Sequence, residues 1–244
     1  MKIGAFLKAA LLIFLCVFIV KPEFFASFLA PFTRNNAPAI YTQNSLLALT
    51  IHHLALVALA TVTATIVAVS LGILTTRPSG REFLPLSRAI ANIGQTFPPV
   101  AVLAIAVPIF GFGSTPAFIA LLLYGLLPIF ENTLTGLSDL DPEVVDAGRG
   151  MGMTDRELLF NVELPLAFPV ILSGIRLAAI ISLSTATIGS TVAASTLGEV
   201  IVAGLLSGNT AFVLQGGFIV ASLAILLNAA FVSLEEKLTR STAH

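Results

Sequence analysis

The residues that could perform covalent chemistry are few and lack the partners that they would need. The 244-residue sequence has one cysteine, Cys16, and three histidines, His52, His53 and His244. A serine hydrolase needs an activated serine beside a base, and no Gly-x-Ser-Gly sequence accompanies the histidines. The metal-binding sequence His-Glu-x-x-His is also absent from the chain. We therefore expect no catalytic residue, no metal site and no cofactor.

Charged residues that could act on a partner gather in one segment. Nine of them lie in the 25 positions between Asp139 and Glu163. Pro142 can begin a helix there, because a first-turn residue needs no N–H partner, and the acids at positions 141, 143 and 146 suit the positive start of a helix. The glycines at positions 148, 150 and 152 weaken this helix and end it.

A second helix is indicated after these glycines. Thr154 and Glu157 form the Thr-x-x-Glu pattern of a capping box, in which each side chain accepts a hydrogen bond from a backbone amide of the other residue. Pro165 and Pro169 then mark the return of the chain into the bilayer. The segment 137–167 is therefore expected to fold as two short helices broken at the glycines.

The elements that must position this segment are hydrophobic. Hydrophobic residues make up 57% of the chain, charged residues only 10%, and the mean hydropathy is +1.00. Soluble domains carry about 25% charged residues, so this composition indicates an all-α polytopic membrane protein. The formal net charge of −1 excludes a broadly basic protein that binds nucleic acid.

Long stretches without charge indicate the membrane spans. A span needs roughly 20 apolar residues, and four stretches of at least that length carry no Asp, Glu, Lys or Arg: 35–76, 89–130, 177–198 and 200–234. Together with an amino-terminal helix that lacks an Ala-x-Ala cleavage site, they predict six spans in a single transmembrane domain over residues 1–244. The predicted spans are 4–20, 45–75, 88–110, 116–136, 168–192 and 211–234.

The basic residues predict the orientation of these spans. With the amino terminus in the cytoplasm, ten of the 12 Lys and Arg residues lie inside, and only Lys21 and Arg34 lie outside. We therefore expect both termini to be cytoplasmic, and the segment 137–167 to be the largest cytoplasmic loop.

The spacing of residues in this loop resembles the EAA loop of binding-protein-dependent ABC importer permeases. The family pattern is Glu-Ala-Ala, three residues, Gly, nine residues and Ile-x-Leu-Pro. This chain has Asp-Ala-Gly at 146–148, Gly152 and Val-Glu-Leu-Pro at 162–165, so the spacing is kept and three residues differ conservatively. The resemblance implies a coupling helix over roughly 143–157 that contacts an ATPase. The residues that it implies for this coupling are Asp146, Ala147, Gly148, Arg149, Gly150, Met151, Gly152, Met153, Thr154, Glu157, Leu164 and Pro165. A short helix that exposes Met151 and Met153 beside Arg149, Asp155 and Arg156 offers an adaptable apolar patch within a polar rim.

A longer resemblance, from about Asn92 to Asn209, is to the osmoprotectant permeases, which import glycine betaine, choline, carnitine or related quaternary amines. It rests on the segments IGQTFPPVAVLAIAVPIFGFG, ALLLYGLLPIFENTLTGL and DAGRGMGM. It implies a type I ABC importer permease-like fold in the bacterial inner membrane. The implied partners are a cytoplasmic ABC ATPase dimer, a second permease subunit of the same or a related chain, and an extracytoplasmic substrate-binding protein that Glu199 would face. The chain lacks the phosphate loop Gly-x-x-x-x-Gly-Lys-Ser/Thr, so ATP hydrolysis would belong to another chain.

Several polar or helix-breaking residues within the spans are candidates for lining a translocation pathway. Two consecutive prolines, without amide hydrogens, should break the third span and expose carbonyl groups that suit a water-filled cavity. Each candidate also has an alternative interpretation. The break could be a kink required by packing, and the acid in span four could be a residue that snorkels to the interface. The small residues of span five could serve helix packing. The candidates are Gln95, Thr96, Phe97, Pro98, Pro99, Glu131, Asn132, Ser184 and Thr187. His52 and His53 are interpreted as interfacial polar residues rather than a proton relay, and Arg176 as a snorkelling residue.

A stand-alone ion-coupled secondary transporter is the alternative function. Such a carrier would show two related halves with paired broken helices and buried ion-binding carboxylates. The sequence shows neither feature clearly, and it contains a coupling loop that such a carrier does not need.

Overall fold

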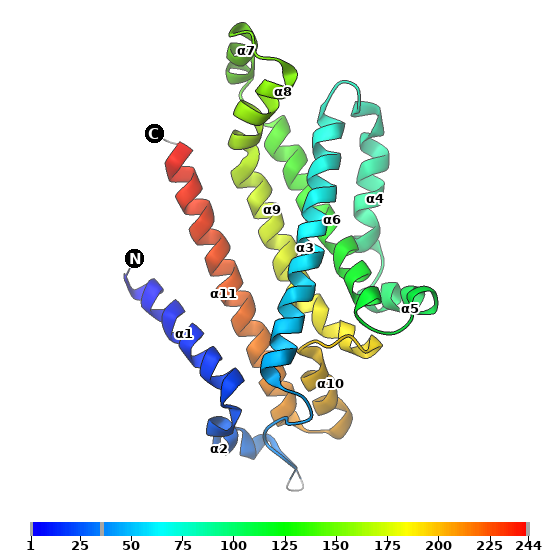
Figure 1. The fold of residues 1–244 in the computed structure, drawn as a ribbon, viewed down its shortest axis with the longest axis vertical. Helices are drawn as coiled ribbons and strands as arrows, with labels where there is room; N and C mark the ends of the chain where they lie inside the picture. Colours follow the sequence, from blue (N-terminus) through cyan, green and yellow to red (C-terminus); the bar gives the residue numbers. More distant parts are fainter. Residues whose placement is uncertain (1, 35–36, 243–244) are drawn as a thin grey trace. The chain divides into compact units, whose positions relative to one another are not determined.

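The computed structural model describes residues 2–34 and 37–242, and this part of the chain consists of helices and the loops that connect them, without a strand (Figure 1). Asn35 and His244 lie outside the described residues, as do the side chains of Lys2 and Arg240. The main helices are α1 (Lys2–Val20), α3 (Leu46–Thr76), α4 (Leu84–Thr96), α5 (Pro99–Phe110), α6 (Ser114–Ser138), α7 (Pro142–Gly150), α8 (Asp155–Leu158), α9 (Leu164–Thr185), α10 (Gly198–Ser207) and α11 (Thr210–Thr242). Short helical segments join several of them: η1 (Pro22–Phe25), α2 (Ala26–Leu29), η2 (Ala30–Phe32), η3 (Arg81–Phe83), η4 (Leu159–Glu163) and η5 (Ala186–Val192).

Four of these helical stretches are long and apolar enough to cross a membrane. They cover Leu46–Thr76, Ser114–Ser138, Asp155–Val192 and Thr210–Leu238, and the number becomes six if each of two bent helix pairs forms one span. The expected all-α membrane fold is therefore confirmed, with four to six candidate spans. Each of the six predicted ranges falls on one of these stretches or pairs.

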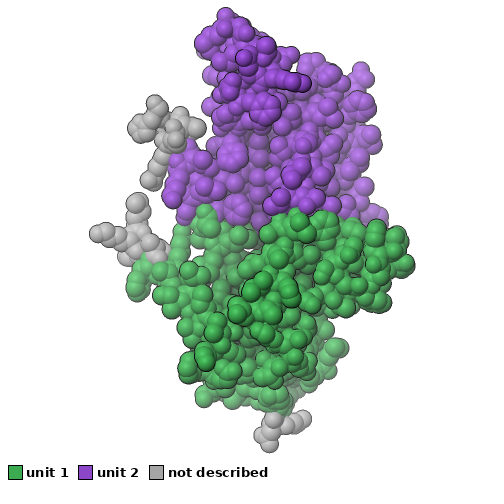
Figure 2. All heavy atoms as spheres, in the orientation of Figure 1, with its two compact units in different colours: residues 1–60, 98–121, 180–230 green, residues 61–97, 122–179, 231–244 purple. Residues whose placement is uncertain are grey.

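Contacts divide the chain into two compact units, shown in different colours in Figure 2. Unit 1 comprises residues 1–60, 98–121 and 180–230. Its core is rich in large side chains, and five ring pairs with centroid distances of 4.8 to 6.0 Å join α1, η1 and α11. The four rings of this aromatic cluster are Phe14, Phe18, Phe25 and Phe218.

Unit 2 comprises residues 61–97, 122–179 and 231–244, and small residues allow its helices to approach closely. Ala64, Ala68, Ala91 and Ala178 are buried in its core. A Cβ atom on Gly94 of α4 would lie 2.2 Å from the Leu123 carbonyl oxygen of α6. Such close backbone approach is typical of helices that pack in lipid.

The proline pair ends one helix and begins another. α4 ends at Thr96, Phe97 is extended (φ −98°, ψ 139°), Pro98 caps the next helix and α5 starts at Pro99. The residue before a proline disfavours helical geometry, which explains the extended Phe97. The break expected in the third span is therefore present as an interruption between two helices.

The second helix of the charged segment differs from the prediction. α8 does not end as a short helix, because it continues through a π turn, η4 (Leu159–Glu163), into α9, so that one helical stretch covers 155–192. The Leu164 N–H donates to the Leu159 carbonyl, five residues back, just before Pro165. A π turn admits an extra residue within a helix. Pro165 accordingly lies within a continuous helical stretch, two residues after the π turn, rather than at a boundary.

Candidate functional site

The coupling segment predicted from the charge pattern begins as expected. α7 starts at Pro142, and the Asp141 carboxylate accepts a hydrogen bond from the Glu143 N–H at 2.9 Å. The helix ends at Gly150, among the three glycines that were expected to end it. The structure thus bears out the predicted start and end of the first helix.

The turn from α7 to α8 is also built from the predicted residues. Gly152 has a φ of +82°, which costs glycine little and strains other residues. The Glu157 carboxylate accepts hydrogen bonds from the Thr154 N–H and hydroxyl, both at 2.8 Å, and the Glu157 N–H donates to Thr154 Oγ1 at 3.3 Å. The capping box is therefore complete.

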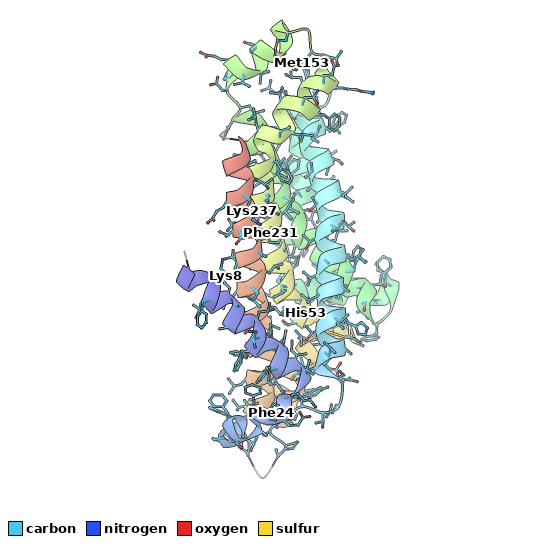
Figure 3. All side chains as sticks on the ribbon, turned by 60° about the vertical axis from the view of Figure 1, so that its left-hand side comes forward. Lys8, Phe24, His53, Met153, Phe231 and Lys237 are labelled. Carbon is cyan, nitrogen blue, oxygen red and sulfur yellow. The ribbon has the colours of Figure 1, made fainter. Side chains whose placement is uncertain are left out.

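One side chain of this segment lies differently from the expectation. Met151 is 71% exposed, but Met153 is half-buried in the turn beside Gly148 (Figure 3). A Cβ atom on Gly148 would lie 2.6 Å from Leu158 Cδ1 and 3.5 Å from Met153 Sδ. Gly148 thus permits α7 and α8 to pack together, a role that its helix propensity alone did not indicate.

The exposed surface of α7 combines one apolar pair with charges. Val144 of α7 and Met151, which directly follows it, are exposed, and so are Asp146 and Arg149, which form an ion pair at 3.3 Å. We call these four residues the α7 surface. Of the other predicted coupling residues, Ala147, Gly150, Thr154 and Glu157 are exposed, whereas Leu164 and Pro165 lie in the first turn of α9.

The pathway candidates are divided between the two units. Gln95, Thr96, Phe97, Glu131 and Asn132 belong to unit 2, and Pro98, Pro99, Ser184 and Thr187 belong to unit 1. In unit 1, Ser184 is exposed, and the Thr187 hydroxyl donates to the Ser184 carbonyl at 2.7 Å. Pro99 borders a small cavity, together with Ala117 and Gly189.

Polar contacts engage the candidates of unit 2. Arg88 donates two hydrogen bonds to Glu131, at 2.6 and 3.0 Å, and Asn132 donates to the Pro128 carbonyl at 2.8 Å. Gln95 donates to the Tyr124 carbonyl at 3.3 Å, and the Tyr124 hydroxyl donates to the Phe97 carbonyl. The last two of these bonds tie the end of α4 to α6.

His53 is buried among protein groups, which the interpretation of it as an interfacial polar residue did not foresee. It lies on α3 (Figure 3) and is fully buried in unit 1. The Leu197 N–H donates to His53 Nδ1 at 3.3 Å, and His53 Nε2 lies 3.0 Å from the Leu183 carbonyl oxygen. Because Nδ1 accepts, the proton of a neutral ring is on Nε2, which donates to Leu183. His53 thus clamps two backbone groups, while His52 is exposed.

Arg176 also departs from its sequence interpretation. It forms an ion pair with Glu235 of α11, with an Nε–Oε1 distance of 3.2 Å, instead of only snorkelling. Ser173 of α9 donates to the same carboxylate oxygen at 3.3 Å.

Glu199 of α10 is held by the loop that precedes α3. Its carboxylate accepts hydrogen bonds from the Tyr41 hydroxyl, at 2.5 Å, and from the Asn44 amide. Burial and the neighbouring Glu199 both raise the pKa of Tyr41, so its hydroxyl remains a donor at neutral pH. Glu199 also borders a cavity of about 600 Å³ in unit 1, together with Gln43 and Phe212.

Comparison with known proteins gives consistent matches over most of the chain. The family described as "Binding-protein-dependent transport system inner membrane component" matches residues 68–242. The osmoprotectant import permease protein OsmY of Salmonella typhimurium is 41% identical over 186 residues, which cover 76% of this chain and 79% of that protein. The carnitine transport permease protein OpuCB of Listeria monocytogenes is 39% identical over 197 residues (80% and 89%). The choline transport system permease protein OpuBB of Bacillus subtilis is 37% identical over 184 residues (73% and 85%).

Solved structures share the fold at lower identity. An inward-facing form of the MetNI methionine ABC transporter has a chain with a TM-score of 0.69 and 20% identity, and the match covers 81% of this chain and 99% of that one. An amino acid ABC transporter solved with histidines gives a TM-score of 0.62 at 18% identity, covering 80% and 92%.

Proposed function

Because the chain belongs to the family of inner membrane components of binding-protein-dependent transport systems, we propose that it is the permease subunit of an ATP-driven importer of a quaternary ammonium osmoprotectant. The observation that carries this proposal is the α7 surface, a set of exposed apolar and charged side chains on and directly after a helix that is capped at its start and packs against α8 at Gly148. Three relatives at 37–41% identity are named for osmoprotectant, carnitine and choline transport. Choline and carnitine share a trimethylammonium group, which supports this substrate class.

The α7 surface would seat on a cytoplasmic ATPase. Met151 and Val144 offer apolar area that a partner can bury, and the exposed Asp146 and Arg149 offer groups for polar bonds with it. α8 passes without interruption into α9, so a displacement of α7 by the ATPase would be carried into a membrane-spanning helix. The permease would bind the substrate only in transit, receiving it from an extracytoplasmic binding protein and working beside a second permease subunit.

Reconstitution tests this function. We expect uptake of glycine betaine, choline or carnitine into proteoliposomes that contain the permease, the ATPase and the binding protein, and only with ATP on the ATPase side. Gly152→Val, strained at its positive φ, and Asp146→Lys should leave the permease inserted yet lower ATPase association and uptake together. Robust uptake by this chain alone, driven by an ion gradient, would show a secondary transporter instead.

We further propose that both termini are cytoplasmic and that the pathway candidates line the route of the substrate. The charge bias supports the orientation, and the helix break at Phe97–Pro98 supports the route. Single cysteines in a Cys16→Ser background test both: Gln43→Cys should react with an impermeant reagent from outside, Arg156→Cys should not, and substrate should slow the labelling of Ser184→Cys. External labelling at position 156 would show that the proposed orientation is reversed. If substrate does not change the labelling rate at position 184, that residue does not line the route.

A further inference from the structure

A partly buried ion pair lies next to the coupling segment, in unit 2. Glu163 is the last residue of the π turn between α8 and α9, and its side chain is only 8% exposed. Arg77 directly follows α3, and its side chain is 26% exposed. Arg77 Nη2 donates to Glu163 Oε2, which joins two parts of the chain that are 86 residues apart in sequence.

The pair is joined to α7 by direct packing. Leu158, directly before the π turn, and Val162, within it, lie 2.6 and 4.0 Å from the position that a Cβ on Gly148 would take. Gly148 is in the last turns of α7, so the inner face of the coupling helix rests on the helical turn that presents Glu163. The contacts form a continuous series from α7 through the π turn to Arg77 and α3. A series of this kind can carry a displacement between distant sites if one of its elements has two arrangements.

The guanidinium group has a second arrangement available. Arg77 Nε is buried and has no hydrogen-bond partner among the described residues, although the fork of an arginine can bind a carboxylate through two nitrogens. A buried donor without a partner is costly. A small shift of the π turn would let the second oxygen of Glu163 accept from Nε and convert the single bond into a two-bond pair.

We propose that Arg77 and Glu163 are positioning residues through which a displacement of α7 reaches α3. The inference rests on the proposed function, since it supposes that an ATPase moves α7. Neither residue needs to touch substrate or nucleotide. Their role is to make α3 follow the coupling segment, in addition to α9, which follows it through the unbroken helix.

The test measures substrate taken up per ATP hydrolysed by the reconstituted complex of permease, ATPase and binding protein. Arg77→Gln and Glu163→Gln should each lower this ratio by about tenfold, within the range by which residues along a coupling network change coupling. The double variant Arg77→Met/Glu163→Leu separates coupling from stability, because two apolar residues can replace a buried ion pair without loss of folding. We expect its melting temperature in detergent to return towards the wild-type value while the ratio stays low.

A second ion pair of unit 2 serves as the control. Arg176 and Glu235 also join two helices and are also partly buried, at 30% and 18% side-chain exposure, but they lie on α9 and α11. Arg176→Met/Glu235→Leu should change the melting temperature without changing the ratio.

The outcomes distinguish the two proposals. If Arg77→Met/Glu163→Leu recovers both the melting temperature and the ratio of uptake to ATP hydrolysis, the pair only stabilises the fold. An unchanged ratio in both single variants would also contradict the proposed positioning role. Absence of ATP-dependent uptake in the wild-type complex would instead contradict the proposed function, and with it the positioning role of Arg77 and Glu163.

Discussion

Units 1 and 2 use different interactions to join their helices. Unit 1 contains six charged residues, Lys2, Lys8, Lys21, Glu23, Arg34 and Glu199, and its helices are joined by aromatic rings and by neutral hydrogen bonds such as those of His53 and Gln215. Unit 2 carries the remaining charged residues, and the four ion pairs found among the described residues all lie in it. The difference indicates that charge is concentrated in unit 2, which contains the coupling segment, whereas Glu199 is the one carboxylate of unit 1 that holds neighbouring side chains among the described residues.

The largest expected effect breaks a contact on which unit 1 depends. A Cβ atom on Gly198 would lie 1.7 Å from the Thr187 carbonyl oxygen, and a backbone atom cannot move aside as a side chain can. Gly198→Ala should therefore destabilise the protein by about 3 kcal/mol or more, at the upper end of overpacking effects. Thermal unfolding in detergent measures this. Gly217→Ala is the control, because nothing lies within 4 Å of its Cβ position; equal melting temperatures of the two variants would contradict the contact.

The neutral clamp of unit 1 gives an effect of intermediate size. His53→Ala leaves the Leu197 N–H and the Leu183 carbonyl without their partner and should cost about 1–3 kcal/mol of unfolding free energy. His52→Ala, at the exposed neighbouring position, should have little effect. Equal unfolding free energies for the two variants would show that His53 is not a clamp.

The smallest effect concerns an exposed ion pair of unit 2. Arg88 and Glu131 have side-chain exposures of 52% and 37%. We expect a double-mutant cycle with Arg88→Gln and Glu131→Gln to give a coupling energy of about 0.2–1 kcal/mol, which falls as salt is added. The same cycle on Arg77 and Glu163 should give a larger coupling energy with less dependence on salt. Similar coupling energies for the two pairs would contradict the expectation that the partly buried pair, Arg77 and Glu163, interacts more strongly than the exposed pair.

Local signals in the sequence determined the features that depend on a few neighbouring residues. The start of α7 at Pro142, the capping box of Thr154 and Glu157 and the turn at Gly152 each require contacts only within about one turn, so residue type and spacing were sufficient. The membrane helices followed from uninterrupted apolar stretches of about 20 residues. The family resemblance rested on motif spacing in the same way.

Only the tertiary structure decided the features that join distant residues. Arg77 and Glu163 are 86 residues apart and His53 and Leu197 are 144 apart, so no local pattern distinguishes a buried partner from a residue at the membrane surface. The sequence predicted a second short helix before the chain returns into the bilayer at Pro165 and Pro169, whereas a π turn lets α8 continue into α9. From the sequence, Gly148 is only a residue of low helix propensity, whereas the structure shows that Leu158 packs against it. In each case the outcome depends on which helices approach each other, and that is set by the packing of the whole chain rather than by neighbours in sequence.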